Sequence, residues 1–284
     1  MVFRGRVRHL LQGSTILLAS MLANAGDGKL LGTAGLSQLE GSGGGGLVPW
    51  ATLSGYDSGD EVSGAIFSTN VNVQDYHLQV WGANVGLYDR LELSYARQTF
   101  DLSTLGLQIR QSVVGAKVRL YGDVVYSDWP QVSVGWQRKT LVDDTVALGV
   151  GAKEANHGDD VYLATTKLHL GLAAGYNVIW NLALRGTKAN QLGLLGFGGE
   201  KSTSRNYVLE GSLGVLLNQH WAVGAEYRQK PDNLGLKEDD WKDIFVSYFP
   251  NKHLNLTLAY ASLGEIANAG KQEGLYLSLT GYLW

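Results

Sequence analysis

Ionisable side chains recur at alternate positions in this chain, and their spacing indicates that they line one side of a wall. Alternation of apolar and polar residues over about ten positions is typical of a β-strand with two different faces. In the segment 109–122, for example, Lys117 and Arg119 lie opposite Val118. The set that this alternation places on the polar face comprises Lys117, Arg119, Lys139, Lys167, His169, Arg185, Glu210, Glu226, Arg228 and Asp243.

The signs of these charges are separated along the chain. The basic members lie between residues 109 and 188, and the acidic members lie between 205 and 249, with Arg228 and Glu92 as exceptions. Opposed arcs of charge would create a transverse field that orients polar or charged solutes in a pore. Alternatively, the charges cross-pair into a salt-bridge lattice that fills a narrow lumen. The sequence leaves both interpretations open.

The sequence gives little support for catalysis, metal binding or nucleic-acid binding. No Ser lies in a G-x-S-x-G setting, and the chain has no Cys, so no disulfide, Cys-ligated metal or thiol nucleophile is possible. Two acid-rich segments, 153–160 and 237–243, lack the pattern of a calcium-binding EF-hand. The net charge of −3 gives no basic footprint for nucleic acid. We therefore predict no catalytic, cofactor or metal site.

The N-terminus has the features of an export signal. Arg4, Arg6 and Arg8 precede a short apolar stretch, and Ala23-Asn24-Ala25 is a small-x-small cleavage site. Residues 1–25 are therefore predicted to be a cleaved signal peptide. After Gly26 no apolar run reaches the roughly 18–20 residues that a membrane helix needs. The exported chain is thus expected to be either soluble outside the inner membrane or a membrane β-barrel.

The links between the expected strands favour the barrel. Short turns, such as Tyr88-Asp89 and Tyr176-Asn177, alternate with longer links at 101–108, 142–159, 189–204, 230–240 and 264–272. Outer-membrane barrels have this arrangement, with short periplasmic turns and longer external loops. We predict an all-β, antiparallel transmembrane barrel over residues 26–284. Its strands are expected at 28–39, 47–56, 62–71, 75–87, 90–100, 109–122, 130–141, 160–175, 178–188, 205–217, 220–229, 241–249, 253–263 and 273–284.

The first two of these fourteen strands are open to another interpretation. Pro49 cannot donate to a strand ladder, and the glycine run 43–46 is flexible. If residues 26–57 enter the lumen instead, they form a plug and twelve strands remain. Both counts are even, so the termini stay on the periplasmic side in either case.

Several long blocks resemble a known family. They are GGGLVPWA, GLYDRLELSYARQTFDL, GAKVRLYGDVVY, NQLGLLGFGG, VGAEYRQKPDNLG and DIFVSYFPNKHLNLTLAY. Together they are similar to the domain of unknown function 3034 family of exported Gram-negative proteins, over essentially the whole mature chain. This resemblance implies a barrel integral to the outer membrane. The family has no established activity, so no functional residue is transferred from it.

The last strand also resembles the signal that the barrel-assembly machinery reads, which favours a terminal aromatic residue and another two positions before it. Trp284 and Tyr282 match this pattern, whereas Ser278 and Thr280 depart from its preference for apolar residues. The expected partners are that machinery, periplasmic chaperones, outer-membrane lipids and lipopolysaccharide.

These observations lead to a functional hypothesis. The chain is expected to be a porin-like channel or transporter for small polar or charged solutes. One alternative is a structural or adhesive barrel whose lumen is plugged, for instance by residues 41–49. A further alternative is an enzyme that modifies lipid or lipopolysaccharide at the rim.

Overall fold

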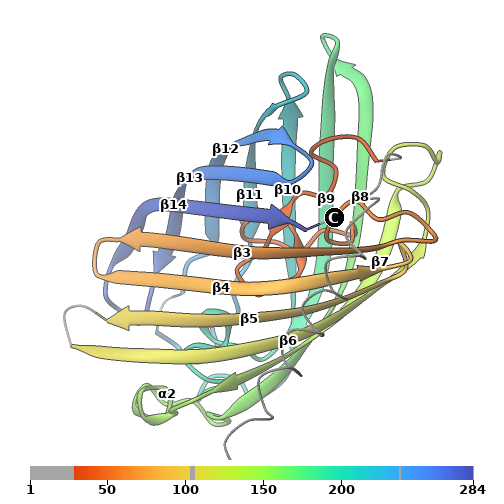
Figure 1. Cartoon of the computed structure of the whole chain (residues 1–284). Helices are drawn as coiled ribbons and strands as arrows, with labels where there is room; N and C mark the ends of the chain where they lie inside the picture. The colour runs from red at the N-terminus through yellow and green to blue at the C-terminus, as the bar shows by residue number, and fades with distance from the viewer. Residues whose placement is uncertain (1–28, 103–105, 237, 284) are drawn as a thin grey trace, which may run out of the picture.

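The barrel wall contains twelve antiparallel strands in the computed structural model, which describes residues 29–102, 106–236 and 238–283 (Figure 1). Each strand pairs with its neighbour in sequence, and β14 pairs with β3 to close the sheet. Closure leaves no unpaired strand edge exposed to lipid. The strands are β3 (Val62–Val73), β4 (Tyr76–Leu87), β5 (Leu91–Leu102), β6 (Leu107–Tyr121), β7 (Gln131–Leu141), β8 (His157–Ala173), β9 (Tyr176–Thr187), β10 (Asn206–Leu216), β11 (Trp221–Arg228), β12 (Trp241–Asn251), β13 (Leu254–Glu265) and β14 (Lys271–Tyr282).

The prediction of fourteen strands is wrong, and the alternative of twelve is confirmed. The described residues of the expected strands 28–39 and 47–56 are not part of the wall. Within the described residues before β3, the named strands are β1 (Leu36–Ser37) and β2 (Gly43–Gly44), which pair as a two-stranded hairpin inside the barrel, and Gly44 also forms an isolated bridge with Pro49. Pro49 and the glycine run explain this result, because neither favours a long hydrogen-bonded strand. The predicted signal peptide lies outside the described residues.

The two faces of the wall differ as the sequence alternation predicts. On β13, Leu256 and Leu258 are more than two-fifths exposed, whereas Asn255 and Thr257 between them are buried. The outer face is therefore a band of Leu, Val and aromatic side chains, as a lipid-facing surface requires. None of the helices in the described ranges is long and apolar enough to cross a membrane.

A charge placed on the outer face is expected to destabilise the barrel in a depth-dependent way. Leu277 lies in the middle of β14 and points outward, whereas Leu283 follows the end of that strand. Leu277→Arg should lower the free energy of unfolding by about 2–4 kcal/mol, and Leu283→Arg by about 0–1 kcal/mol. Denaturant titration in phospholipid vesicles measures both. Equal losses would contradict the assigned membrane position.

The links sort by length between the two ends of the barrel, with few exceptions. Short turns at 88–90, 174–175, 217–220 and 252–253 lie at the end where β14 finishes, which we call the periplasmic end. Longer links lie at the opposite, external end, including 142–156 with α2 (Thr145–Gly149) and 188–205 with η1 (Gln191–Gly193). The exceptions are the external links 74–75 and 103–106, of two and four residues, and the nine-residue periplasmic link 122–130.

Candidate functional site: the filled lumen

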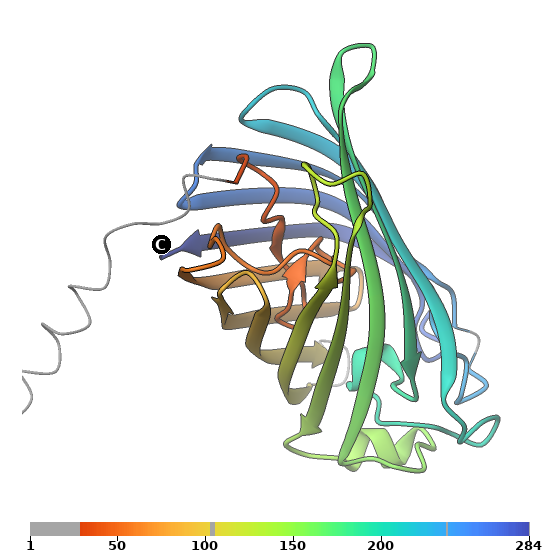
Figure 2. The same cartoon turned by 90° about the vertical axis from the view of Figure 1, so that its right-hand side faces the viewer.

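Residues 29–61, which we call the plug, run into the barrel and occupy its lumen (Figure 2). From residue 33 to residue 57 every plug residue is buried. Leu39, Leu47, Val48 and Leu53 are at most 1% exposed, and Trp50 is 5% exposed. The plug thus fills the space that a channel would need for solute.

The periplasmic end of the plug is held by Tyr282. Its ring packs edge to face on Tyr56, with 5.3 Å between the centroids, and its hydroxyl donates to the Gly35 carbonyl at 2.5 Å. Asn255 donates to the same carbonyl at 3.2 Å. Tyr282 therefore points into the lumen. Its role in barrel assembly stays a prediction, and Trp284 lies outside the described residues.

A buried ion pair joins the plug to one side of the wall. The Lys117 ammonium lies 3.0 Å from the Glu92 carboxylate and donates to the backbone carbonyls of Gly43 and Thr52 at 2.8 and 2.6 Å. Glu92 accepts from the backbone amides of Gly43 and Ser54 at 3.0 and 2.7 Å. Both charged side chains are at most 1% exposed. The pair therefore fixes two separate turns of the plug.

Removing only one member of this pair should be strongly destabilising. Lys117→Met leaves the Glu92 carboxylate buried without its cation, so we expect a loss of about 3–5 kcal/mol in the free energy of unfolding. In Lys117→Met/Glu92→Gln no uncompensated charge remains, and part of that loss should return. Urea titration of the two variants and the unmodified protein tests this. If the double variant is no more stable than Lys117→Met, the unpaired charge of Glu92 does not cause the loss of stability.

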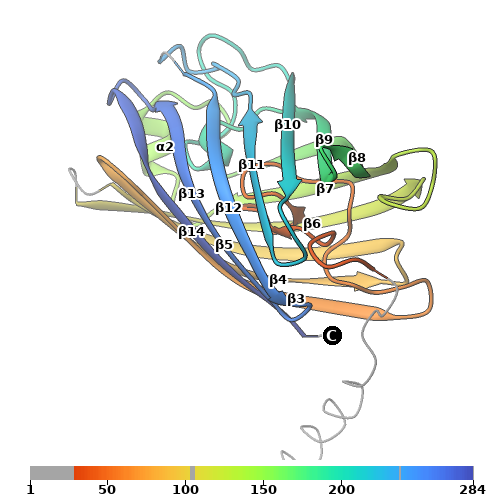
Figure 3. The same ribbon diagram turned by 90° about the horizontal axis from the view of Figure 1, so that it is seen from above.

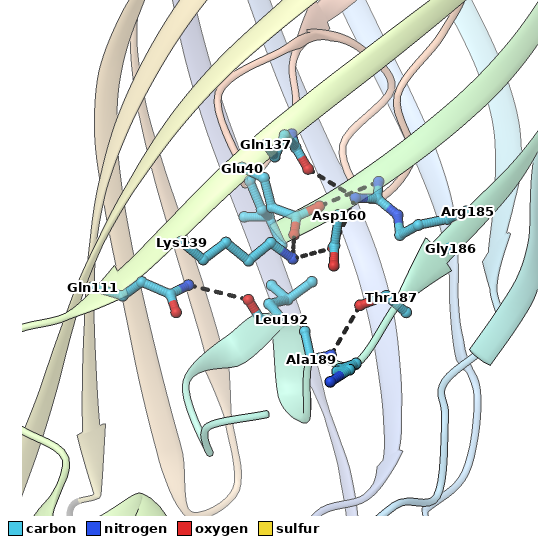
Figure 4. Close-up of polar contacts among 12 residues, drawn as sticks. Glu40, Gln111, Gln137, Lys139, Asp160, Arg185, Gly186, Thr187, Ala189 and Leu192 are labelled. Carbon is cyan, nitrogen blue, oxygen red and sulfur yellow. Dashed lines mark hydrogen bonds and ion pairs between the residues drawn. The ribbon is translucent and has the colours of Figure 1, made fainter. Parts of the chain in front are cut away.

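The plug also contributes one carboxylate to a charged cluster in the centre of the lumen (Figure 4). The Glu40 carboxylate lies 2.8 Å from Arg228 and 3.4 Å from Arg185, and it also pairs with Lys139. Glu40 stands in the turn of the β1–β2 hairpin. The central network, as we call it, consists of Glu40, Lys139, Asp160, Arg185, Glu210 and Arg228.

The wall supplies the other carboxylates of the central network. Asp160 lies 2.6 Å from Lys139 and 3.2 Å from Arg185. Glu210 lies 2.6 Å from Arg185 and 3.3 Å from Arg228. Each of the six side chains is at most 6% exposed. Three cations thus meet three carboxylates, and the balance is complete only while Glu40 is in place.

Arg185 is the member with the most partners. Besides pairing with all three carboxylates, it donates to the Gln137 side-chain oxygen at 2.7 Å. Its guanidinium also lies 5.1 Å from the centre of the Tyr162 ring. A planar group with five donors suits this arrangement, whereas a lysine would supply a single point of charge.

Glu226 and Asp243 form a second acidic feature of the lumen. They are opposite each other in the β11–β12 register, and both are buried. The Glu226 carboxylate accepts from the Leu47 backbone amide of the plug at 2.7 Å. Within the described ranges neither acid pairs with a Lys or Arg side chain. The acids predicted between 205 and 249 therefore divide between an ion-paired group and an unpaired one.

Three of the predicted lumen residues do not belong to these groups. Arg119 stands at the periplasmic end, where it pairs with Asp89 and, at 3.2 Å, with Asp123. Lys167 donates to backbone carbonyls of the link 122–130. His169 accepts from the Trp180 indole at 3.1 Å.

The strand register explains the difference for Lys167 and His169. Both lie on the same face of β8 as Val161 and Leu163, which are nearly half exposed. The alternate residues Thr166 and Leu168 point to the other face and are buried. Lys167 and His169 therefore do not line the lumen. The prediction assigned charge to the inner face, but near a strand end a lysine can bond loop carbonyls instead.

Glu40 and Asp160 are the network members that the predicted set omits. Glu40 precedes the glycine run, where no periodicity marks a face. Asp160 is both the last residue of the acid-rich segment 153–160 and the first of the expected strand 160–175, and the structure places it within β8, which begins at His157. Alternation with Tyr162 and Ala164 was the signal that would have placed Asp160 on the inner face.

The link 188–205 covers the lumen from the external end. Leu192, Leu194 and Leu195 are buried there, and Gln111 of β6 donates to the Leu192 carbonyl at 3.1 Å (Figure 4). Gln191 and Leu192 have left-handed backbone angles, with φ of 46° and 64°. Such angles are unfavourable for these residue types, so the surrounding packing must hold them in place. We call this link the external cover.

Little space remains between the plug and the external cover. Among the described residues, a cavity of about 20 Å³ lies beside the central network and is bordered by Arg185, Glu210, Arg228, Leu192 and Trp241. A volume of this size holds about one water molecule. The lumen in this conformation is closed to solutes.

Comparison with models of known sequence families shows to which family this chain belongs. The model of the family described as "Protein of unknown function (DUF3034)" matches residues 33–280. The chain belongs to the DUF3034 family. The resemblance read from the sequence blocks is thereby confirmed. No curated protein shows significant sequence similarity to this member of the family.

Solved structures that resemble this DUF3034 member are outer-membrane barrels. The KdgM porin aligns with a TM-score of 0.50 at 11% identity, over 76% of this chain and 98% of the porin. The NanC porin aligns with a TM-score of 0.49 at 10% identity, over 77% and 98%. The Acinetobacter baumannii outer membrane protein Omp33 gives 0.47 at 9%, over 79% and 99%. The alignment with KdgM supports the fold, a porin-like outer-membrane barrel.

Proposed function

We propose that this DUF3034 protein is a porin-like channel or transporter for small polar or charged solutes, held closed by its own plug. The observation that carries the proposal is the chemistry of the wall behind the plug. Its side chains are amides, hydroxyls and charges that bond the plug backbone, such as Gln98 to the Leu39 carbonyl at 2.8 Å and Asn181 to the Pro49 carbonyl at 3.1 Å.

A wall of this kind suits a lumen that at times contains water. Replacing buried ion pairs by well-packed apolar residues is often neutral or stabilising. A lumen that never opens therefore has no need of the charged central network. Once the plug is displaced, the same side chains can be solvated or can contact a polar solute.

The closed state should nevertheless dominate. Burial of each large apolar side chain of the plug, such as Leu39, Leu47 or Trp50, contributes about 1.5–3 kcal/mol. Several such contributions, added to the ion pairs, make spontaneous opening rare. We therefore expect brief and infrequent conductance events in planar bilayers, with more at low urea concentrations that weaken the plug.

A removable cross-link tests whether the plug is the gate. The side chains of Ser54 in the plug and Asn84 in β4 are in hydrogen-bond contact, so cysteines at these positions can approach each other. The native chain has no Cys that would compete. Oxidised Ser54→Cys/Asn84→Cys should abolish the conductance events, and reduction should restore them. The single variants Ser54→Cys and Asn84→Cys are the controls.

A permanently plugged structural barrel is the second candidate. It is favoured by the external part of the lumen, where Tyr76, Leu78 and Phe100 of the wall belong to one apolar cluster with Leu192 and Leu194 of the external cover. If neither the reduced double variant nor the unmodified protein conducts at any urea concentration that leaves the barrel folded, this candidate replaces the channel.

A further inference from the structure

We infer that Lys139, Arg185 and Arg228 form a carboxylate-binding site of the lumen and that Glu40 occupies it as an internal ligand in the closed state. The inference rests on the proposed function, because it names the solute class, small carboxylates, that the open lumen would bind. It is carried by the charges of the central network and by the geometry around Glu40.

The charge balance within the central network calls for an anion at this place. The wall contributes three cations to the central network, but only two carboxylates, Asp160 and Glu210. The third carboxylate comes from Glu40 of the plug. When Glu40 leaves, three cations of the central network share two carboxylates, and the other lumen acids, Glu226 and Asp243, form no ion pair with these cations. An anionic solute would restore the balance.

The donors converge on the carboxylate as they would on a ligand. One oxygen of Glu40 lies 2.8 Å from Arg228 and 3.4 Å from Arg185, and the side-chain amide of Gln38 donates to it at 2.8 Å. The other oxygen pairs with Lys139. Arginine recognises planar anions through several directed hydrogen bonds. A carboxylate group therefore fits the site better than a spherical ion.

The site borders a small cavity and is occupied from a hairpin of the plug. The cavity of about 20 Å³ borders Arg185 and Arg228 on their external side, beneath Gln191 and Leu192 of the external cover. Glu40 itself is carried by the turn of a small hairpin, next to Gly41 and the glycine run 43–46. A Cβ added to Gly43, Gly44 or Gly45 would lie within 3.0 Å of neighbouring atoms, so these glycines let the hairpin pack closely against the wall and the rest of the plug. The internal ligand thus belongs to a hairpin of the plug and not to the wall.

Chemical rescue tests the site without requiring conduction. Glu40→Ala removes a fragment the size of acetate and leaves the three cations in place. Saturating acetate should raise the melting temperature of this variant in detergent by about 3–5 °C. Chloride at the same ionic strength and the neutral isostere acetamide should not. Glu40→Gln, which keeps the volume filled, is the matched control and should respond to acetate less than Glu40→Ala does.

The outcomes separate the two proposals. Rescue by acetate in a barrel that never conducts would support the carboxylate site and reject the channel. Conductance without rescue would support the channel and reject the site. An acetate effect on Glu40→Ala no larger than that of chloride overturns the inference.

A second measurement remains available if Glu40→Ala does not fold. Ser42, two residues from Glu40, is 1% exposed. In Ser42→Cys, with Glu40 unchanged, acetate should increase the rate of maleimide labelling at least twofold over chloride, because it competes with Glu40 for the cations. Equal rates in both salts contradict the proposed competition.

Discussion

Glu40→Gln is expected to increase channel opening about 10²- to 10³-fold in planar bilayers. The substitution keeps the shape of the side chain but leaves the three cations of the central network with two carboxylates. Removing one partner of a buried charge cluster costs about 3–5 kcal/mol, and each 1.4 kcal/mol corresponds to a factor of ten. Because Glu40 belongs to the plug, this loss falls on the plugged state. Single-channel recordings measure the open probability.

A charge-balanced double variant is the control for this prediction. In Glu40→Gln/Arg228→Gln, two cations, Lys139 and Arg185, face two carboxylates, Asp160 and Glu210. The closed state should therefore recover much of its stability, and openings should again become rare. If the double variant opens as often as Glu40→Gln, the effect comes from lost plug contacts and not from charge balance.

Arg185→Met should give the largest loss of stability of any single substitution in the lumen. Arg185 contacts Glu40, Asp160 and Glu210, and its removal leaves three buried carboxylates with two cations. We expect the free energy of unfolding to fall by at least about 3–5 kcal/mol. Urea titration in detergent or vesicles provides the measurement.

Arg185→Lys shows whether charge alone explains the loss. Lysine keeps the charge but cannot reproduce the separate contacts of the guanidinium with Glu210, Asp160 and Gln137. We expect it to recover only part of the lost stability. Full recovery would mean that the directed hydrogen bonds contribute little.

Two of the sequence blocks that resemble the family close the lumen. GGGLVPWA lies in the plug, and NQLGLLGFGG forms most of the external cover. The second block is predicted to lie in the external link 189–204, and it does connect two strands, β9 and β10, at the external end. Its inward fold (Figure 3 shows the barrel from above) depends on contacts such as that of Gln111 with Leu192. No local pattern encodes such a contact.

The charged residues of the wall also show what local sequence predicts and what it leaves open. Alternation placed Lys117, Lys139 and Arg185 on the inner face because the side-chain direction on a strand depends only on position along that strand. It did not distinguish opposed arcs of charge from a lattice of ion pairs. The structure contains the lattice, and its centre is a plug residue that the sequence did not single out.

The sequence by itself determined that this protein is an outer-membrane β-barrel with an apolar outer face and a polar inner face. These properties repeat every two residues and depend on near neighbours, so they can be read locally. Only the tertiary structure decided that twelve strands form the wall and that the lumen is filled. The contact of Glu40 with Arg228 spans 188 positions in the chain. Such a contact exists only after the barrel has closed around the plug.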